Sequence, residues 1–249
     1  MAKLTKKQKI AAEKIEDGKF YAPYDACALV KEISSANFDE TVECHFRLGI
    51  DTRKADQQLR GTVSLPNGTG KTVRVAVFAE GEAARAAEEA GADIVGVTEL
   101  MEDIQAGKFE FDAAIATPDQ MGKVGRLGKI LGPRGLMPNP KLGTVTNDVA
   151  KAIKELKGGR VEYRADRYGI AHVVIGKASF TAEQLAENYG TVYDEILRNK
   201  PAAAKGKYVK SVTMCSSMGA GVPVDASVTR NYTVSADSTD CFYGKAASV

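Results

Sequence analysis

The sequence predicts a two-domain protein in which a small, mostly parallel α/β domain is inserted into an α+β first domain of helices and antiparallel strands. Apolar residues alternate over 38–50, which indicates a half-buried strand of the first domain. Strand and helix patterns then alternate over 72–116, as in a parallel α/β unit. Beyond Gly158-Gly159 the strand-rich pattern returns, so we expect the chain to re-enter the first domain there.

The first part of the chain is predicted to contain two helices and two strands. Helical spacing of apolar residues indicates helices over 5–16 and 24–34. The strand over 38–50 follows, and a second strand over 58–65 ends at Pro66-Asn67-Gly68, a strong turn signal. The chain is therefore expected to leave the first domain at this turn.

The inserted domain is predicted from short apolar strands that are separated by Ala/Glu-rich helices. Its expected elements are a strand over 72–79, a helix over 82–90, a strand over 93–97, a helix over 99–106, a strand over 112–116 and a closing helix over 147–156. A Gly/Pro-rich segment over 122–143 precedes the closing helix.

The returning half of the first domain is predicted to contain a hairpin, a long helix and a final strand. The hairpin would join strands over 161–164 and 171–175 around Tyr168-Gly169. A long helix is expected to begin after Thr181, whose hydroxyl suits an N-cap. The final strand then leads into the turn 216–219.

These elements define the expected domain limits. The first domain comprises 1–67 and 159–224, the inserted domain comprises 68–158, and the polar tail 225–249 is expected to be poorly ordered. The glycines at the two crossings are expected to form a hinge between the domains: Gly68, Gly70, Gly158 and Gly159.

Charge is segregated along the chain, although the net charge is only +2. No acidic residue occurs between Asp119 and Asp148, or between Glu195 and Asp225, and each of these stretches holds five basic residues. Such segregation favours a polyanion partner for part of the surface, but solvated basic faces explain it equally well.

Several classes of protein are disfavoured by the composition. No apolar run approaches the roughly 20 residues that cross a bilayer, and the charged N-terminus is not a secretory signal. The four cysteines show no C-x-x-C spacing, and the chain has only two histidines. We therefore expect reduced thiols in a cytosolic protein, without a metal site.

The run Gly68-Thr69-Gly70-Lys71-Thr72 resembles the end of a phosphate-binding P-loop. The full pattern needs a glycine at the position of Leu65, and a helix must follow so that its N-terminal amides can bind phosphate. The residues 73–77 predict a strand instead. A nucleotide-dependent enzyme is therefore the weaker alternative, and an interdomain connection the stronger one.

Two segments could bind RNA. The turn Ser217-Met218-Gly219 offers a hydroxyl, a polarizable side chain and close backbone approach, and Phe38, expected to open a strand, offers an apolar contact. A turn packed on the core explains the same residues slightly better. The basic Gly/Pro-rich loop 125–140 suits a phosphate backbone or, equally, a structural loop covering a sheet edge.

Four further runs are specific enough to indicate a family: Asn37–Glu43, Arg60–Pro66, Leu131–Lys141 and Gly176–Phe180. In their order, over about residues 1–224, they resemble the ribosomal protein L-one family, the bacterial large-subunit protein of the mobile stalk beside the tRNA exit site.

The resemblance implies a structural constituent of the large ribosomal subunit in the cytoplasm, without cofactor or enzymatic activity. It implies binding to 23S rRNA at the stalk, a part in the release of exit-site tRNA, and translational repression through the mRNA of its own operon. A regulator that binds only mRNA is the remaining alternative. The resemblance also implies that the first domain carries the RNA site and that the inserted domain is Rossmann-like.

RNA-binding roles carry over by motif to Phe38, Thr41, Glu43, Arg164, Arg167, His172, Ser211, Thr213, Ser217, Met218 and Gly219. Glu43 is expected to accept a hydrogen bond from a 2′-OH or a base amino group, or to brace Arg164. Where the family commonly has Thr-Met-Gly-Pro, this chain has Ser217-Met218-Gly219-Ala220, which keeps the hydroxyl and loses a methyl contact.

Overall fold

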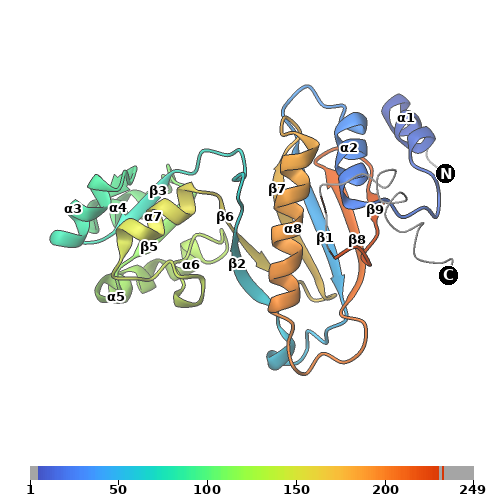
Figure 1. Cartoon of the computed structure of the whole chain (residues 1–249). Coiled ribbons are helices and arrows are strands. Elements are labelled where there is room, and N and C mark those ends of the chain that lie inside the picture. Colours follow the sequence, from blue (N-terminus) through green and yellow to red (C-terminus); the bar gives the residue numbers. More distant parts are fainter. Residues whose placement is uncertain (1–4, 230–231, 233–249) are drawn as a thin grey trace, which may run out of the picture. The chain divides into compact units, whose positions relative to one another are not determined.

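The computed structural model describes residues 5–229 and 232 (Figure 1). These residues fall into two compact units, one with the chain up to Gly70 and from Val161 onward, the other with Lys71–Arg160. The architecture is mixed α/β, with an antiparallel sheet in the first unit and a parallel sheet in the second. The chain thus crosses between the units twice, close to the predicted hinge glycines.

The first unit is built from both ends of the chain. Its elements are α1 (Lys6–Lys14), α2 (Pro23–Ile33), β1 (Thr41–Leu48), β2 (Arg60–Ser64), β6 (Arg160–Arg164), β7 (Ile170–Lys177), α8 (Ala182–Arg198), β8 (Val209–Ser216) and β9 (Val222–Val224). Four strands form a sheet in the order β7-β1-β8-β9, while β2 and β6 form a separate two-stranded sheet. The strand β1, which precedes the insertion in sequence, is therefore paired on both sides with strands that follow it.

One face of the four-stranded sheet packs on α2 and α8 (Figure 1). The predicted alternation in β1 is confirmed, since Val42, Cys44, Phe46 and Leu48 are buried while the residues between them are more exposed. The Phe46 ring stacks on Tyr189 of α8 with their centroids 6.0 Å apart. The opposite face of the sheet is consequently left for polar side chains.

The helix α8 begins as predicted. The Thr181 hydroxyl accepts a hydrogen bond from the amide of Gln184, and the Gln184 side chain accepts one from the amide of Thr181. This reciprocal pair satisfies two of the amides that have no partner within the helix.

The predicted hairpin between 161–164 and 171–175 is wrong. The strand β7 pairs along its length with β1, whereas β6 pairs with β2, and an isolated bridge joins Ala165 to Ala171. Pairing with β1 buries Val173 and Ile175 in the main core. That burial outweighs local strand pairing, because buried apolar area dominates the free energy of folding.

The second unit consists of a parallel sheet covered on both faces. Its larger elements are β3 (Val75–Phe78), α3 (Glu82–Glu89), β4 (Ile94–Val95), α4 (Thr98–Gln105), β5 (Ala113–Ala116) and α7 (Val149–Lys157), with the sheet order β4-β3-β5. Alternate residues of β3 face two separate clusters, Val75 and Val77 on the side of α3 and α7, Ala76 and Phe78 on the side of α4.

The Gly/Pro-rich segment 122–143 is not an extended loop. It folds into short helical turns that include α5 (Met121–Val124) and α6 (Gly128–Leu131), and these bury Val124, Leu127 and Leu131 beneath the sheet. The Arg134 guanidinium lies 3.7 Å from the centre of the Phe109 ring. These contacts give the segment a structural role in the core of this unit.

Most of the tail 225–249 lies outside the described residues. Of the described part, 225–229 and Tyr232, two residues contact α8, because the carbonyl of Ala226 accepts a hydrogen bond from the Tyr193 hydroxyl and Tyr232 packs on the helix. The Tyr232 ring centroid lies 5.6 Å from that of Tyr189, and its hydroxyl donates a hydrogen bond to Asp194.

Other expectations concern thiols and membranes. In the described part of the chain, Cys27, Cys44 and Cys215 are free thiols, while Cys241 lies outside it. Burial raises the pKa of Cys27 to about 12. None of the described helices has both the length and the apolar character needed to cross a membrane.

Candidate nucleic-acid interface

Polar side chains from three strands gather on the sheet face opposite α2 and α8. The register places His45 of β1 between His172 of β7 and Thr213 of β8. Strand alternation puts further polar residues on the same face: Thr41, Glu43, Arg47, Ser211 and Cys215. Five predicted RNA-binding residues thus share one surface, namely Thr41, Glu43, His172, Ser211 and Thr213.

Two histidines and a thiol form a hydrogen-bonded chain at the centre of this face. The Nδ1 atoms of His45 and His172 are 2.8 Å apart, and Nε2 of His45 lies 3.2 Å from the Cys215 Sγ. Contact between two ring nitrogens requires one to donate and the other to accept, so the pair holds a proton between them. Burial, followed by the neighbouring His172, lowers the pKa of His45.

The turn after β8 is tied to the start of β1. The Ser217 hydroxyl accepts a hydrogen bond from the amide of Thr41 at 3.1 Å and donates one to the carbonyl of Thr41 at 3.3 Å. A side chain at Gly219 would collide with the Ser216 hydroxyl. Gly219 therefore lets the turn pack against its own strand.

Glu40 is a buried carboxylate that organises this end of the sheet. One oxygen accepts hydrogen bonds from the amides of Ser35 and Ala36, at 3.0 and 2.7 Å, and the other accepts from the amide of Met218 at 3.1 Å. Burial opposes ionisation, but the Ser216 hydroxyl and these amides outweigh it and lower the pKa of Glu40 to about 2. The carboxylate therefore remains charged at neutral pH.

The prediction that Phe38 opens a strand is wrong, because β1 begins at Thr41. The amides of Ser35 and Ala36 turn inward to Glu40 instead, and the chain bends at Asn37-Phe38. The bend leaves the Phe38 ring 59% exposed.

The interface offers apolar side chains rather than free backbone amides. The amides of Met218 and Gly219 are already bonded, to Glu40 and to the carbonyl of Ser216. The Met218 side chain, by contrast, is 73% exposed. The predicted contacts of Phe38 and Met218 thus remain available to a ligand, whereas direct phosphate binding by these amides does not.

Two predicted residues lie outside the sheet face. Arg164 belongs to β6 in the two-stranded sheet, so the predicted brace between Arg164 and Glu43 joins residues of different sheets. Arg167 lies in the turn before β7, where its guanidinium is 4.9 Å from the centre of the Tyr168 ring. These two arginines therefore do not form part of the polar sheet face.

The connection at 68–72 lacks the geometry of a P-loop. It leads into the strand β3, and the Lys71 ammonium donates a hydrogen bond to Asp112 at 2.7 Å. Nor do the described residues contain a group of three or more His, Cys, Asp or Glu side chains arranged to hold a metal ion.

The structure adds three residues that sequence patterns did not single out: Glu40, His45 and Cys215. Glu40 lies on the same side of the alternating pattern as the buried residues of β1. An acidic side chain at a core position was therefore the signal in the sequence that could have identified it. The proximity of His45 to Cys215 depends on the register between β1 and β8, for which the sequence offers no local signal.

Comparison with known proteins gives a consistent result. A model of the ribosomal protein L1p/L10e family matches residues 30–220. The large ribosomal subunit protein uL1 of Corynebacterium diphtheriae is 65% identical over 233 residues, covering 94% of this chain and 99% of that protein. The proteins of the same name from Corynebacterium kroppenstedtii and Mycolicibacterium smegmatis are 62% and 59% identical, over 95% and 94% of this chain and 100% and 99% of their own lengths.

Proposed function

The chain belongs to the ribosomal protein L1p/L10e family, and from this premise we propose that it is a non-enzymatic structural component of the large ribosomal subunit. We propose that it binds 23S rRNA at the mobile stalk through the outward face of the sheet β7-β1-β8 and the residues Phe38 and Met218. Residues 1–67 and 159–224 would then form the RNA-binding domain.

The observation that carries this proposal is the exposure of two large apolar side chains beside a polar strand face. Phe38 and Met218 are 59% and 73% exposed, although Glu40 accepts hydrogen bonds from the amide of Met218 and from the amide of Ala36, two residues before Phe38. Aromatic rings and thioethers pack on ribose and base faces, while hydroxyl and imidazole groups bond to 2′-OH groups and base edges. The sheet therefore combines both kinds of contact that RNA recognition uses.

Three finer roles follow from the family. The same face would bind the mRNA of the chain's own operon and repress its translation, and the ribosome-bound protein would take part in release of exit-site tRNA. The second unit would act as a Rossmann-like domain, movable about Gly68, Gly70, Gly158 and Gly159. Its central strand β3 between β4 and β5 supports that assignment.

The test uses the full chain with large subunits that lack this protein and, separately, with a stalk rRNA fragment. We expect co-sedimentation with the subunits, and an affinity for the fragment that falls as salt rises, because phosphate contacts release counterions. Binding to the operon mRNA without co-sedimentation would favour the regulator that acts only on mRNA. Absence of binding to either RNA would overturn the proposal.

A further inference from the structure

A groove of about 790 Å³ opens beside the Phe38 and Met218 end of the sheet. Its walls come from three segments of the first unit: α1, the residues that follow α2, and the turn after β8. Phe38, Met218 and Gly219 line the groove and also belong to the candidate interface. The groove is therefore continuous with the surface proposed to bind RNA.

The floor of the groove is apolar. Ala11 of α1 and Ile33 of α2 are 7% and 6% exposed, and both belong to the main core. Ala12, which lies on the same wall as Ala11, is exposed and short, so this wall leaves space beside the helix. A flat ring can lie against this apolar floor of the groove without displacing core side chains.

Most of the polar side chains in the lining are neutral: Thr5, Gln8, Ser35 and Asn37. Asn37 is exposed at the bend that carries Phe38. Its amide offers a donor and an acceptor side by side, the combination that pairs with the edge of a nucleobase. An apolar peptide side chain cannot form hydrogen bonds with these groups, whereas a nucleobase can form them along its edge.

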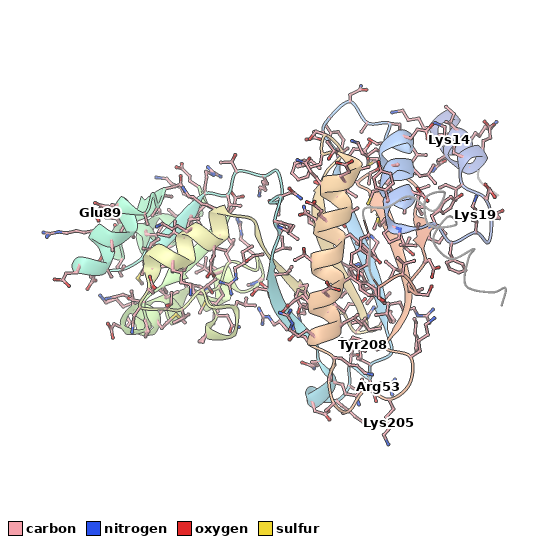
Figure 2. All side chains as sticks on the ribbon, in the orientation of Figure 1. Lys14, Lys19, Arg53, Glu89, Lys205 and Tyr208 are labelled. Carbon is pink, nitrogen blue, oxygen red and sulfur yellow. The ribbon has the colours of Figure 1, made fainter. Side chains whose placement is uncertain are left out.

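The helix that forms one wall is basic. The sequence of α1 contains four lysines and one glutamate. Lys7 lines the groove and donates a hydrogen bond of 2.5 Å to the carbonyl of Ser35. Lys14, which is labelled in Figure 2, pairs with Glu32 of α2. Asp17 is the acidic member of the lining. Positive charge along α1 favours a phosphate at the mouth of the groove.

We propose that this groove holds one unstacked nucleotide of the bound RNA, with its base against the apolar wall of α1 and its edge toward Asn37. Phe38 and Met218 would then cover the exposed face of the base. The volume lies within the roughly 300–1,000 Å³ of small-ligand sites, and protein recognition of RNA favours bases that can leave their stack. This inference rests on the proposed function, since it assigns a nucleotide of that RNA to a place beside the interface.

The experiment fills the groove without altering the candidate interface. Ala12→Phe places a ring in the groove, and Ile10→Phe places the same ring on an exposed position of α1 outside the lining. Affinity for the stalk rRNA fragment should fall about tenfold in Ala12→Phe, since stacking of one base on a protein is worth a factor of this order. Ile10→Phe should bind as the wild type does, and both variants should show unchanged helical circular dichroism.

A second arm identifies the occupant. RNA fragments with one unpaired base removed at a time are bound by wild type and by Ala12→Phe. At one position, loss of the base should weaken wild-type binding about tenfold. The Ala12→Phe variant should bind that fragment as well as it binds the intact one, because the substitution and the loss of the base remove the same contact. Additive losses at every position, or equal affinity of wild type and Ala12→Phe, would overturn the nucleotide site. Failure of the wild type to bind the intact fragment would instead count against the proposed function.

Discussion

The carboxylate of Glu40 accepts a hydrogen bond from the amide of Met218 at 3.1 Å, although 178 positions separate the two residues in the chain. Its other oxygen accepts from the amides that precede Phe38. One buried side chain thus ties the turn that carries Met218 to the segment that leads into Phe38. The arrangement of this end of the sheet therefore depends on a group that is itself fully buried.

Replacing Glu40 with Gln should therefore lower both stability and RNA affinity. The amide nitrogen cannot accept the hydrogen bonds that the carboxylate accepts, so unfolding free energy should fall by about 2 kcal/mol, as for other buried groups left unsatisfied. RNA affinity should fall several-fold under conditions in which the variant is fully folded. Glu32→Gln, which breaks only an exposed ion pair, should cost less than about 1 kcal/mol and leave affinity unchanged.

The effect of Glu40→Gln should also depend on pH. The pKa of Glu40 is about 2 in the fold and has an ordinary value of 4.5, so its ionised form stabilises the fold fully above about pH 4.5. That contribution is lost as pH falls toward 2. Denaturant unfolding should show the gap between wild type and variant shrinking over this range, and a constant gap would contradict the assignment.

Phe38→Ala and Met218→Asp should each weaken binding to the stalk rRNA fragment by at least about tenfold, because each removes a packing contact with base or ribose. Both side chains are largely exposed, so melting temperatures should stay close to that of the wild type. Phe20 is 65% exposed and lies outside the interface, which makes Phe20→Ala a matched control. Wild-type affinity in both test variants would refute the site.

Acid should destabilise the fold through His45. The pKa of this histidine is lowered in the fold by burial and by His172, so the unfolded chain binds more protons as pH falls below about 6.5. The wild type should lose stability through that range, and His45→Gln should show a flatter curve. In His172→Gln, proton titration followed by NMR should show the pKa of His45 closer to its ordinary value. If the stability of wild type and of His45→Gln changed with pH in the same way, the result would argue against this role of His45.

Hinge motion is tested by fluorescence energy transfer between the two units. Glu89 and Lys205 are exposed and lie in different units (Figure 2), so Glu89→Cys with Lys205→Cys provides the label sites in a Cys215→Ser, Cys241→Ser background. The distance distribution should change when the RNA fragment binds. The same single distance with and without RNA would show that the connections are rigid.

The glycines at the connections should differ in importance. Gly68, Gly70 and Gly159 have positive φ angles of 67°, 70° and 94°, which disfavour other residues. Gly158 has φ −74° at the end of α7, a conformation open to any residue. Gly70→Ala should therefore destabilise the first unit more than Gly158→Ala does, as measured by unfolding.

Features with a local cause could be predicted from the sequence. The cap at Thr181 depends on neighbouring residues alone, and the alternation of Val42, Cys44 and Phe46 with more polar residues is visible in the local sequence. Strand partners could not be predicted in this way. The turn before β7 is typical of a hairpin, yet β7 pairs with a strand from the other side of the insertion.

The candidate site was predictable in its composition more than in its chemistry. Motif resemblance indicated Phe38, Ser217, Met218 and Gly219, and the structure brings the corresponding segments together at one end of the sheet. The resemblance did not indicate that the Glu40 carboxylate and the Ser216 carbonyl accept hydrogen bonds from the amides of the turn. Those contacts join distant segments, and they leave the Phe38 and Met218 side chains, not the amides of the turn, free for contact with a ligand.

The central position of β1 also imposes an order on biosynthesis. Its edges are covered by β7 and β8, and the hydrogen bond between Thr41 and Ser217 spans 176 positions. A nascent chain must therefore carry β1 unpaired through translation of the whole inserted unit, whose own contacts are complete earlier. We expect the inserted unit to fold first and the sheet of the first unit to close only as the last strands emerge, so that a truncated product would lack the candidate interface.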